Sequence, residues 1–452
     1  MPRSILQLLG YFAPLFSTPT WKNILVLVRA HLMSRGRRTF TDLLRLAGHK
    51  DDGNFSRFHR VFSQGKWSAY KVAKTLLERL IVSFSSGKGL VFIIDETLER
   101  RKGPMIQGLG SHRDAVRSTK DRKAFSIGIS WLVTALRIRV PWSGRFAALP
   151  FLTILMPSKR VLTSSRNPKD VAGKRKYKTY TRWTEQVIYT LRRWLKNVKF
   201  TVVADSAFAT YSICRTCIRH NATLVSRLRL DAKLFDYPPP TKEGRGRPRK
   251  VGKRQTSLKE RATNRTEPWK KMTVSWYGGK KAQVTVLSGV SLWYDYSSKN
   301  FPIPVKWVLI KDVHCHNKPV VLFATDVDLS VEELIGLYVS RWTLETTFEE
   351  TRRHLGMETH RNWADKSIAR LTPSILASYS FTWLAAAALV GERDTIQPQQ
   401  TAWYQKDSVT FADAADLVRR EIIRESFFSA RVPGCKRRKI PSMLQAFWAM
   451  AG

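Results

Sequence analysis

The sequence predicts a mixed α/β protein in which a central sheet is flanked by helical regions at both ends of the chain. Apolar residues recur at helical spacing before about residue 88 and again from Ser330 onward. Between these regions, unbroken apolar runs typical of buried strands alternate with one helical stripe. The chain has 452 residues, and a length of about three average domains predicts roughly two to four domains.

The composition is that of a folded polycation. The chain carries 78 Lys and Arg residues against 35 Asp and Glu residues, which gives a formal net charge of +43. Hydrophobic residues make up 43% of the chain, far more than a disordered basic tail contains. Such a charge excludes most soluble metabolic enzymes. It favours nucleic acid over an acidic membrane as the partner, because basic side chains that neutralise phosphates release condensed counterions.

No export signal or membrane span is evident in the sequence. The amino end has too short an apolar stretch for a secretory signal. The longest apolar run, Ser374–Val390, contains hydroxyl side chains and falls short of the roughly 20 residues that cross a bilayer, so we expect a buried helix there. Four cysteines in a chain of this length do not form a disulfide framework, which predicts a reducing compartment, the cytoplasm.

Two of these cysteines raise the question of a zinc site. Cys214 and Cys217 are spaced like zinc ligands, and the segment His314-Cys315-His316 could supply the other half of a site. We favour a helix-core interpretation, because both cysteines lie in an apolar-periodic segment. No phosphate-binding glycine loop or dinucleotide fingerprint is convincing, so no small-molecule cofactor is expected.

The first 88 residues are expected to form a helical DNA-binding region. Four helical segments are predicted there, at residues 21–33, 39–48, 53–62 and 67–84. The second and third flank a short polar turn, as in a helix-turn-helix that presents Arg57 and Arg60 to DNA. Phe55, Phe58 and Phe62 would then pack inward. An ordinary helical bundle explains the pattern equally well.

Two aspartates follow predicted buried strands. Leu90–Ile94 is an unbroken apolar run followed by Asp95, and the similar segment Lys199–Ala204 supplies a strand followed by Asp205. A carboxylate at the end of a buried strand is costly to ionise unless a cation offsets it. That cation is either a metal ion or a Lys or Arg side chain in a structural ion pair.

The middle of the chain, residues 226–328, is predicted to be a β-rich insertion with a basic loop. Residues 242–271 hold twelve basic residues against three acidic ones. Within them, Gly244-Arg-Gly-Arg-Pro-Arg-Lys250 resembles an AT-hook, an extended segment that lies in a narrow minor groove. The contacts of such a hook would come from Arg245, Arg247, Arg249 and Lys250. Short basic strings rich in Gly and Pro also arise from composition alone.

A further acid lies on a predicted helix with an unusual face. Ser330 and Glu333 form a capping box that fixes the start of this helix. The residues that follow on one face are Tyr338, Arg341, Glu345 and Arg352. Such a face suits a carboxylate that holds a metal ion beside groups that hold a phosphate. A solvated charged face is the alternative, and it is disfavoured by Trp342 and Phe348, which imply packing against a sheet.

In this order, the motifs resemble those of bacterial cut-and-paste insertion-sequence transposases of the DDE superfamily with a Tyr-Arg-Glu-Lys signature. Asp95 in Ile-Ile-Asp-Glu-Thr and Asp205 in Val-Val-Ala-Asp-Ser look like the first and second catalytic aspartates of that family. The segment Tyr338-x-x-Arg341-x-x-x-Glu345 is similar to its signature. Arg352 stands where the family has Lys, and these two cations are not interchangeable at a phosphate.

The resemblance implies an RNase H-like catalytic core interrupted by the β-rich insertion. Asp95, Asp205 and Glu345 would be the catalytic residues and would hold two Mg²⁺ ions, or Mn²⁺ in their place. Water would be the nucleophile when DNA is nicked, and a DNA 3′-hydroxyl when it is joined. Glu349 lies one turn beyond Glu345 on the same face, so only the family spacing prefers Glu345.

The same resemblance implies the DNA contacts. Trp307, in an apolar segment that starts at Pro304, would stack on a base flipped out during hairpin formation, unless it is a core tryptophan. Tyr338, Arg341 and Arg352 would grip the neighbouring phosphate and sugar. The partners would be double-stranded transposon ends and target DNA, bound by a homodimer at the bacterial nucleoid.

These features divide the chain into five segments: residues 1–88, a helical DNA-binding region; 89–225, the first part of the catalytic core; 226–328, the insertion; 329–392, the second part of the core; and 393–452, a helical basic region. The predicted function is a DNA transposase that cuts its own ends and joins them to target DNA. Two alternatives stay open. One is a transposase-derived DNA-binding protein without catalysis, and the other is a metal-dependent nuclease that cuts without joining.

Overall fold

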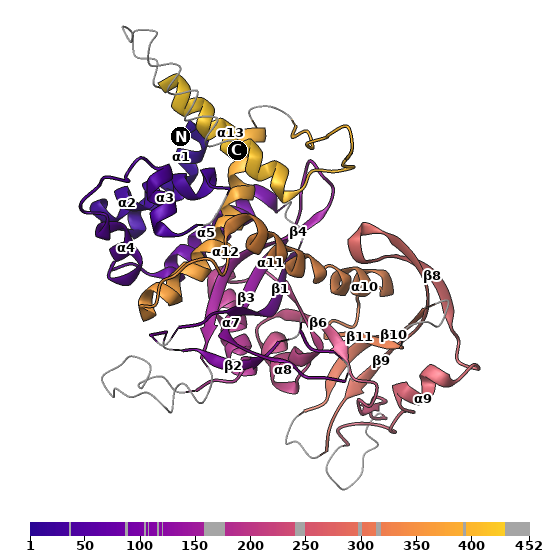
Figure 1. The fold of residues 1–452 in the computed structure, drawn as a ribbon. Helices are drawn as coiled ribbons and strands as arrows, with labels where there is room; N and C mark the ends of the chain where they lie inside the picture. Colours follow the sequence, from indigo (N-terminus) through magenta and orange to yellow (C-terminus); the bar gives the residue numbers. More distant parts are fainter. Residues whose placement is uncertain are drawn as a thin grey trace.

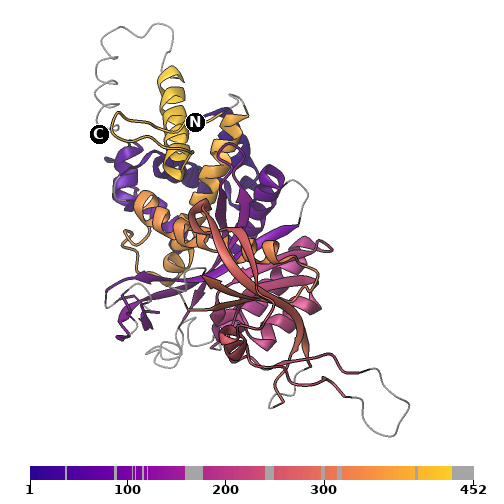
Figure 2. The ribbon, with the colours of Figure 1, turned by 90° about the vertical axis from the view of Figure 1, so that its right-hand side faces the viewer.

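The computed structural model confirms a mixed α/β fold. It describes residues 1–35, 38–85, 89–103, 105–106, 108–114, 117–119, 121–157, 177–239, 249–296, 301–312, 318–391 and 395–429. Figure 1 shows a central sheet with the N-terminal helices at one end of the molecule and the strands of the insertion at the other. In Figure 2 the C-terminal helix α13 (Phe411–Ser429) lies at the same end as the N-terminal helices.

The amino-terminal region is helical, as predicted. Its helices are α1 (Arg3–Gly10), α2 (Thr18–Met33), α3 (Phe40–Leu46), α4 (Ser56–Ser63) and α5 (Ala69–Phe84). Phe58 is fully buried against Leu27 and Phe40, which confirms its inward position. The prediction for Phe55 was wrong: its side chain is 49% exposed, because it precedes the first turn of α4 instead of lying on the buried face.

The strands of the described residues form one sheet in the order β2-β3-β1-β5-β6-β11-β10-β9-β7, with β4 paired to β3 and β8 to β9. Their bounds are β1 (Leu90–Arg100), β2 (Gly110–Arg113), β3 (Phe125–Arg139), β4 (Phe146–Met156), β5 (Phe200–Ala204), β6 (Ala222–Leu228), β7 (Leu234–Phe235), β8 (Lys270–Ser275), β9 (Lys281–Trp293), β10 (Ile303–Asp312) and β11 (Val320–Ala324). Among these pairs, β1–β5 and β5–β6 run parallel and the others run antiparallel. The insertion therefore extends the central sheet, through the pairing of β11 with β6.

Helices cover this sheet and complete the core. They are α7 (Tyr180–Leu195), α8 (Tyr211–Arg219), α9 (Leu258–Thr263), α10 (Val331–Val339), α11 (Trp342–Leu355) and α12 (Asp365–Val390). Among the helices that the structure describes, α12 has the length and apolar composition of a membrane span, but 61% of its most apolar stretch is buried inside the protein. It packs against β4, α5 and α13. The buried helix expected at Ser374–Val390 is therefore the carboxyl half of α12, in the core.

Helix α8 carries the two cysteines with zinc-like spacing. Cys214 and Cys217 are both fully buried in the core, and burial raises the pKa of each thiol. The helix-core interpretation is thus confirmed. The segment His314-Cys315-His316 lies outside the described residues.

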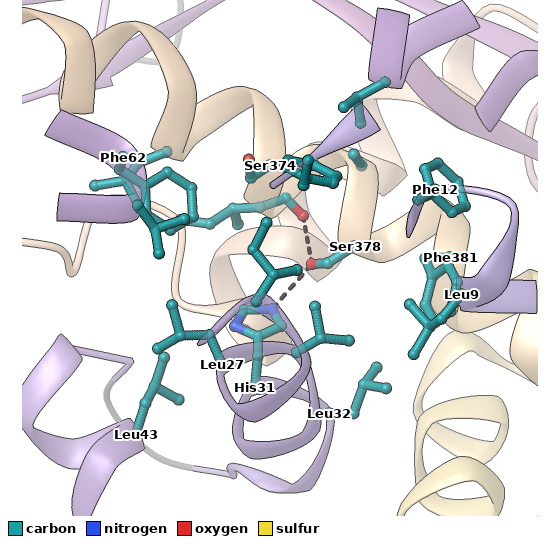
Figure 3. Close-up of a pocket in the computed structure, with 18 of the residues that line it drawn as sticks. Leu9, Phe12, Leu27, His31, Leu32, Leu43, Phe62, Ser374, Ser378 and Phe381 are labelled. Carbon is teal, nitrogen blue, oxygen red and sulfur yellow. Dashed lines mark hydrogen bonds between the residues drawn. The ribbon is translucent and has the colours of Figure 1, made fainter. Parts of the chain in front are cut away.

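The amino-terminal helices meet α12 around an apolar cavity of about 210 Å³. Figure 3 shows Leu27, His31 and Leu32 of α2 on one side of it, and Ser374, Ser378 and Phe381 of α12 on the other. One polar link crosses the cavity edge, between His31 Nε2 and Ser378 Oγ at 2.9 Å. Burial lowers the pKa of His31 well below its usual value, so this link joins two neutral groups.

Candidate active site

The parallel strands β1 and β5 bring Asp95 and Asp205 together. Their pairing ends with Ile94 opposite Ala204. Asp95 is the next residue of β1, and Asp205 is the first residue after β5. The expectation that the first strand ends at Asp95 was wrong, because β1 continues to Arg100 along its antiparallel neighbour β3. At Asp95 the pairing of β1 with β5 has ended, whereas its pairing with β3 continues. The edge of β1 that faced β5 is therefore open to the site.

The helix predicted from Ser330 onward is two helices. The capping box at Ser330 and Glu333 is present, but α10 ends at Val339 and α11 begins at Trp342. At the break, the Arg341 amide donates to the Tyr338 carbonyl at 3.1 Å, which is the tighter spacing of a 3₁₀ turn. At this turn the Arg341 side chain reaches Asp95 on β1.

Arg341 joins two of the three acids. Its Nη1 lies 2.6 Å from Asp95 Oδ2, and its Nη2 lies 2.7 Å from Glu345 Oε1. Tyr338 completes the group, since its hydroxyl donates to Asp205 Oδ1 at 3.5 Å. The structure therefore brings Asp95, Asp205, Tyr338, Arg341 and Glu345 together from β1, the end of β5, α10 and α11.

Burial dominates the electrostatics of this group. Desolvation raises the pKa of Asp95 to about 6, against the opposing charge of Arg341, and the neighbouring Asp205 and Glu345 add to the rise. For Arg341, burial lowers the pKa, but the charges of Asp95 and Glu345 outweigh burial and raise it overall. Arg341 stays protonated, and Asp95 is ionised only at a cost to folding.

That cost predicts a pH-dependent gain in stability when Asp95 is neutralised. The pKa of Asp95 is about 6 in the folded state against 3.8 as the ordinary value, so its contribution to stability is greatest below about pH 4 and is lost as the pH rises through 6. Asp95→Asn should raise the free energy of unfolding by about 1–3 kcal/mol at pH 7, and by nearly nothing at about pH 4. Urea unfolding with a metal chelator measures the difference, and an unchanged stability at neutral pH would contradict the prediction.

The acids that follow Glu345 on α11 form no ion pair with Arg341 among the described residues. Glu349 is exposed. Glu350 accepts a hydrogen bond from the Tyr379 hydroxyl at 2.7 Å, and burial raises its pKa to about 7. Of these three glutamates, Glu345 is the one that pairs with Arg341.

Arg352 lies farther along β1 than the three acids. Its guanidinium donates to Thr97 Oγ1 at 3.0 Å and to Glu358 Oε1 at 3.1 Å. Thr97 is two residues beyond Asp95 on the same face of the strand. The side chain therefore borders the site without contacting Asp95, Asp205 or Glu345 in any hydrogen bond or ion pair of the described residues.

Trp307 does not match its predicted role, because its ring is buried. It lies on β10 with 2% of its surface exposed, and its Nε1 donates to Ser291 Oγ at 2.9 Å. Gly289, opposite it on β9, makes room for the indole, since a Cβ there would lie 2.7 Å from the ring. Trp307 is a core residue, and stacking on a base would require its removal from the core.

Trp307→Ala should therefore destabilise the protein by about 3–5 kcal/mol, because it empties a large buried volume. The same change at Trp342, whose side chain is 47% exposed, should cost less than about 1 kcal/mol. Urea unfolding of both variants gives the comparison. Equal losses, or a smaller loss at Trp307, would overturn the assignment of Trp307 to the core.

Sequence reasoning missed the exposed aromatic residues beside the site. Trp342 directly follows Arg341, and its ring lies edge-on to Tyr277 with centroids 5.6 Å apart. A pocket of about 430 Å³ opens next to them, with Trp276, Tyr277 and Tyr338 in its wall. The packing of Trp342 against a sheet was wrongly predicted, whereas Phe348 is buried as expected. The sequence did contain one sign that Trp342 lies beside the site, because Trp342 directly follows Arg341.

The residues of the AT-hook-like segment are only partly described. Arg245 and Arg247 lie outside the described residues. Arg249 is exposed, and the Lys250 ammonium lies 5.1 Å from the centre of the Phe301 ring. The minor-groove role of the segment stays a prediction.

The chemistry of the site fits a divalent metal ion such as Mg²⁺ or Mn²⁺. Asp95, Asp205 and Glu345 offer only oxygen donors, the kind these ions prefer. The side chains are near one another, since Asp205 and Glu345 both raise the pKa of Asp95. Within the described ranges, no three acidic, His or Cys side chains are already drawn together as metal ligands, and Arg341 holds one oxygen each of Asp95 and Glu345.

The match to a family model agrees with this chemistry. Residues 11–283 match the family model described as a DDE superfamily endonuclease, a stretch that includes Asp95 and Asp205 but ends before Glu345. No curated protein matches the chain. A cryo-EM structure of the piggyBac transposase synaptic complex with hairpin DNA aligns at 11% identity and a TM-score of 0.43, over 95% of this chain and 75% of that chain. Because the family model matches more than half of its length, the chain belongs to the DDE superfamily of endonucleases.

Proposed function

We propose that the protein is a transposase of the bacterial insertion-sequence type with an RNase H-like core. It would cut DNA at the ends of its element and join those ends to target DNA. The observation that carries this proposal is the convergence of Asp95, Asp205 and Glu345 on Arg341 and Tyr338. The three acids lie more than a hundred residues apart in sequence, and membership of an endonuclease superfamily supports the same chemistry.

Each side chain would have a distinct task. Asp95, Asp205 and Glu345 would hold Mg²⁺ or Mn²⁺, which supplies activation of the attacking oxygen and stabilisation of the leaving oxygen. Tyr338 and Arg341 would bind the phosphate at the cleaved bond, and Arg352 would bind the backbone farther along β1. A guanidinium with several donors suits a phosphate because it offers more than one hydrogen bond in a fixed geometry.

The aromatic residues at the rim would contact the bases. The exposed rings of Trp342 and Tyr277 border the carboxylates, and aromatic rings stack on unpaired bases without regard to their identity. They replace Trp307 in this role. A dimer would pair two element ends, and the net charge of +43 would hold it on DNA at the nucleoid of a bacterial cytoplasm.

The experiment uses a plasmid that carries the DNA flanking the coding region on both sides of a marker gene. The purified protein is incubated with this plasmid and a target plasmid in Mg²⁺, with EDTA in a parallel reaction. Excised marker DNA and sequenced junctions in the target are the expected products, in Mg²⁺ only. Cut DNA without junctions would indicate a nuclease, and retarded but uncut DNA a binding protein without catalysis. Either result would overturn the proposal.

A further inference from the structure

The guanidinium of Arg341 has two engaged ends and one free donor. Its Nη1 and Nη2 are paired with Asp95 and Glu345 at 2.6 and 2.7 Å. Its Nε is buried and has no hydrogen-bond acceptor among the described residues. Only 14% of the side chain is exposed, so water does not readily supply that acceptor. A buried donor without a partner is costly, and an incoming acceptor at this position would be favoured.

The same guanidinium competes with a metal ion for carboxylate oxygens. Asp95 Oδ2 and Glu345 Oε1 are donors of the kind that a divalent cation takes, and both are committed to Arg341. A metal ion that binds these two oxygens competes with Arg341 for their lone pairs and weakens both ion pairs. If Arg341 had no new partner, it would then be a buried cation with weakened counterions, and this would oppose metal binding.

A DNA phosphate removes that obstacle. It offers several anionic oxygens, one of which can accept from the free Nε while a second accepts from a terminal nitrogen. Arg341 would then exchange its carboxylate partners for the phosphate, and the released oxygens would become available. Tyr338 lies one turn before Arg341 with its hydroxyl already on Asp205, so it can donate to the same phosphate.

We propose that Arg341 is an exchangeable internal cation that makes metal binding depend on DNA. The inference rests on the proposed function and adds an order to it: the phosphate arrives, Arg341 moves to it, and the carboxylates are freed for the metal. By linkage, DNA raises the affinity for the metal by the same factor as the metal raises the affinity for DNA. The protein would thereby avoid a loaded cleavage site in the absence of its substrate.

The test measures Mn²⁺ binding to the full chain at pH 8, by electron paramagnetic resonance of the free ion. Without DNA, Arg341→Gln should bind Mn²⁺ at least about tenfold more tightly than the parent, within the range of typical coupling between sites. Arg353→Gln is the matched control, because it removes the same charge from an exposed position on α11 that the proposed site does not use. It should change the affinity by less than about threefold.

The second arm adds a short duplex of the element end, with the DNA-only signal subtracted. DNA should raise the Mn²⁺ affinity of the parent by about tenfold or more and leave that of Arg341→Gln nearly unchanged. Arg341→Lys keeps the charge but cannot pair with both carboxylates through two nitrogens, so its response to DNA should lie between those of the parent and Arg341→Gln. If Arg341→Gln does not fold, Arg341→Lys provides the test. Equal affinities of parent and Arg341 variants without DNA would overturn the inference and leave the proposed function intact. No Mn²⁺ binding by any protein, with or without DNA, would instead overturn the proposed function.

Discussion

DNA cleavage should fall by at least about a thousandfold when Asp95 or Asp205 is changed to Asn, or Glu345 to Gln. Each change removes one carboxylate charge from the group around Arg341 and Tyr338 while keeping the size of the side chain. A loss of this size corresponds to about 4 kcal/mol of transition-state stabilisation, which is within the range expected of metal-assisted phosphate chemistry. Single-turnover cleavage of an end-bearing duplex in Mg²⁺ measures it.

Glu349→Gln on the same helix is the matched control for this loss. It makes the same chemical change as Glu345→Gln, one helical turn away, at an exposed position. Its cleavage rate should stay within about threefold of the parent, as expected for surface substitutions. DNA binding by the three active-site variants should also stay within about threefold, because the basic surface is untouched. If Glu349→Gln were as defective as Glu345→Gln, the choice of Glu345 would be wrong.

The two aspartates could be found from the sequence because the pattern that reveals them is local. Leu90–Ile94 is an unbroken apolar run and Phe200–Ala204 is apolar except for Thr201, and β1 and β5 pair in parallel over these residues. Parallel strands that are buried on both faces produce such runs, and their carboxyl ends lie side by side. The acid after each run thus marks the same edge of the sheet, whatever happens elsewhere in the fold.

The break between α10 and α11 could not be predicted in this way. Ser340 and Arg341 both keep right-handed helical backbone angles, with φ of −62° and −54°, so local preference for a helix gives no sign of an end. The contact that accompanies the break is the ion pair from Arg341 to Asp95, which joins residues far apart in sequence. Helical spacing predicted that these side chains share one face, but it did not predict the 3₁₀ turn at Arg341.

The two tryptophans show the limit of apolar patterns on a sheet. Trp307 begins the stretch Trp307–Ile310 of β10, in which successive side chains on both faces are buried, and such a stretch does not show which side faces a ligand. Trp342 lies in a polar segment, and its ring is exposed whereas that of Trp307 is buried. The exposure of each ring depends on the strands and helices that pack around it. Only the tertiary structure supplies that information.

Glu99→Ala should destabilise the protein by about 3–5 kcal/mol, as expected when one member of a buried ion-pair network is removed. Glu99 lies on β1, four residues after Asp95, and is fully buried. Its carboxylate accepts from Trp131 Nε1 at 2.8 Å and from Thr372 Oγ1 at 2.7 Å, and His360 Nε2 lies 3.2 Å away. These contacts tie the strand that carries Asp95 to α12, so the loss should be visible in urea unfolding.

The cost of Glu99→Ala arises chiefly from what is left behind. Arg101 Nη1 lies 3.6 Å from Glu99 Oε1, and 5% of the Arg101 side chain is exposed, so without Glu99 a buried guanidinium loses its carboxylate. Arg101→Met in the Glu99→Ala background should therefore cost less than Arg101→Met alone, by about 1 kcal/mol or more of coupling. Additive losses would contradict an ionised network. Glu99 and Asp95 lie on the same strand, so Glu99→Ala should also lower the cleavage rate at temperatures well below unfolding. The control Glu349→Ala, at an exposed position on α11, should leave that rate unchanged.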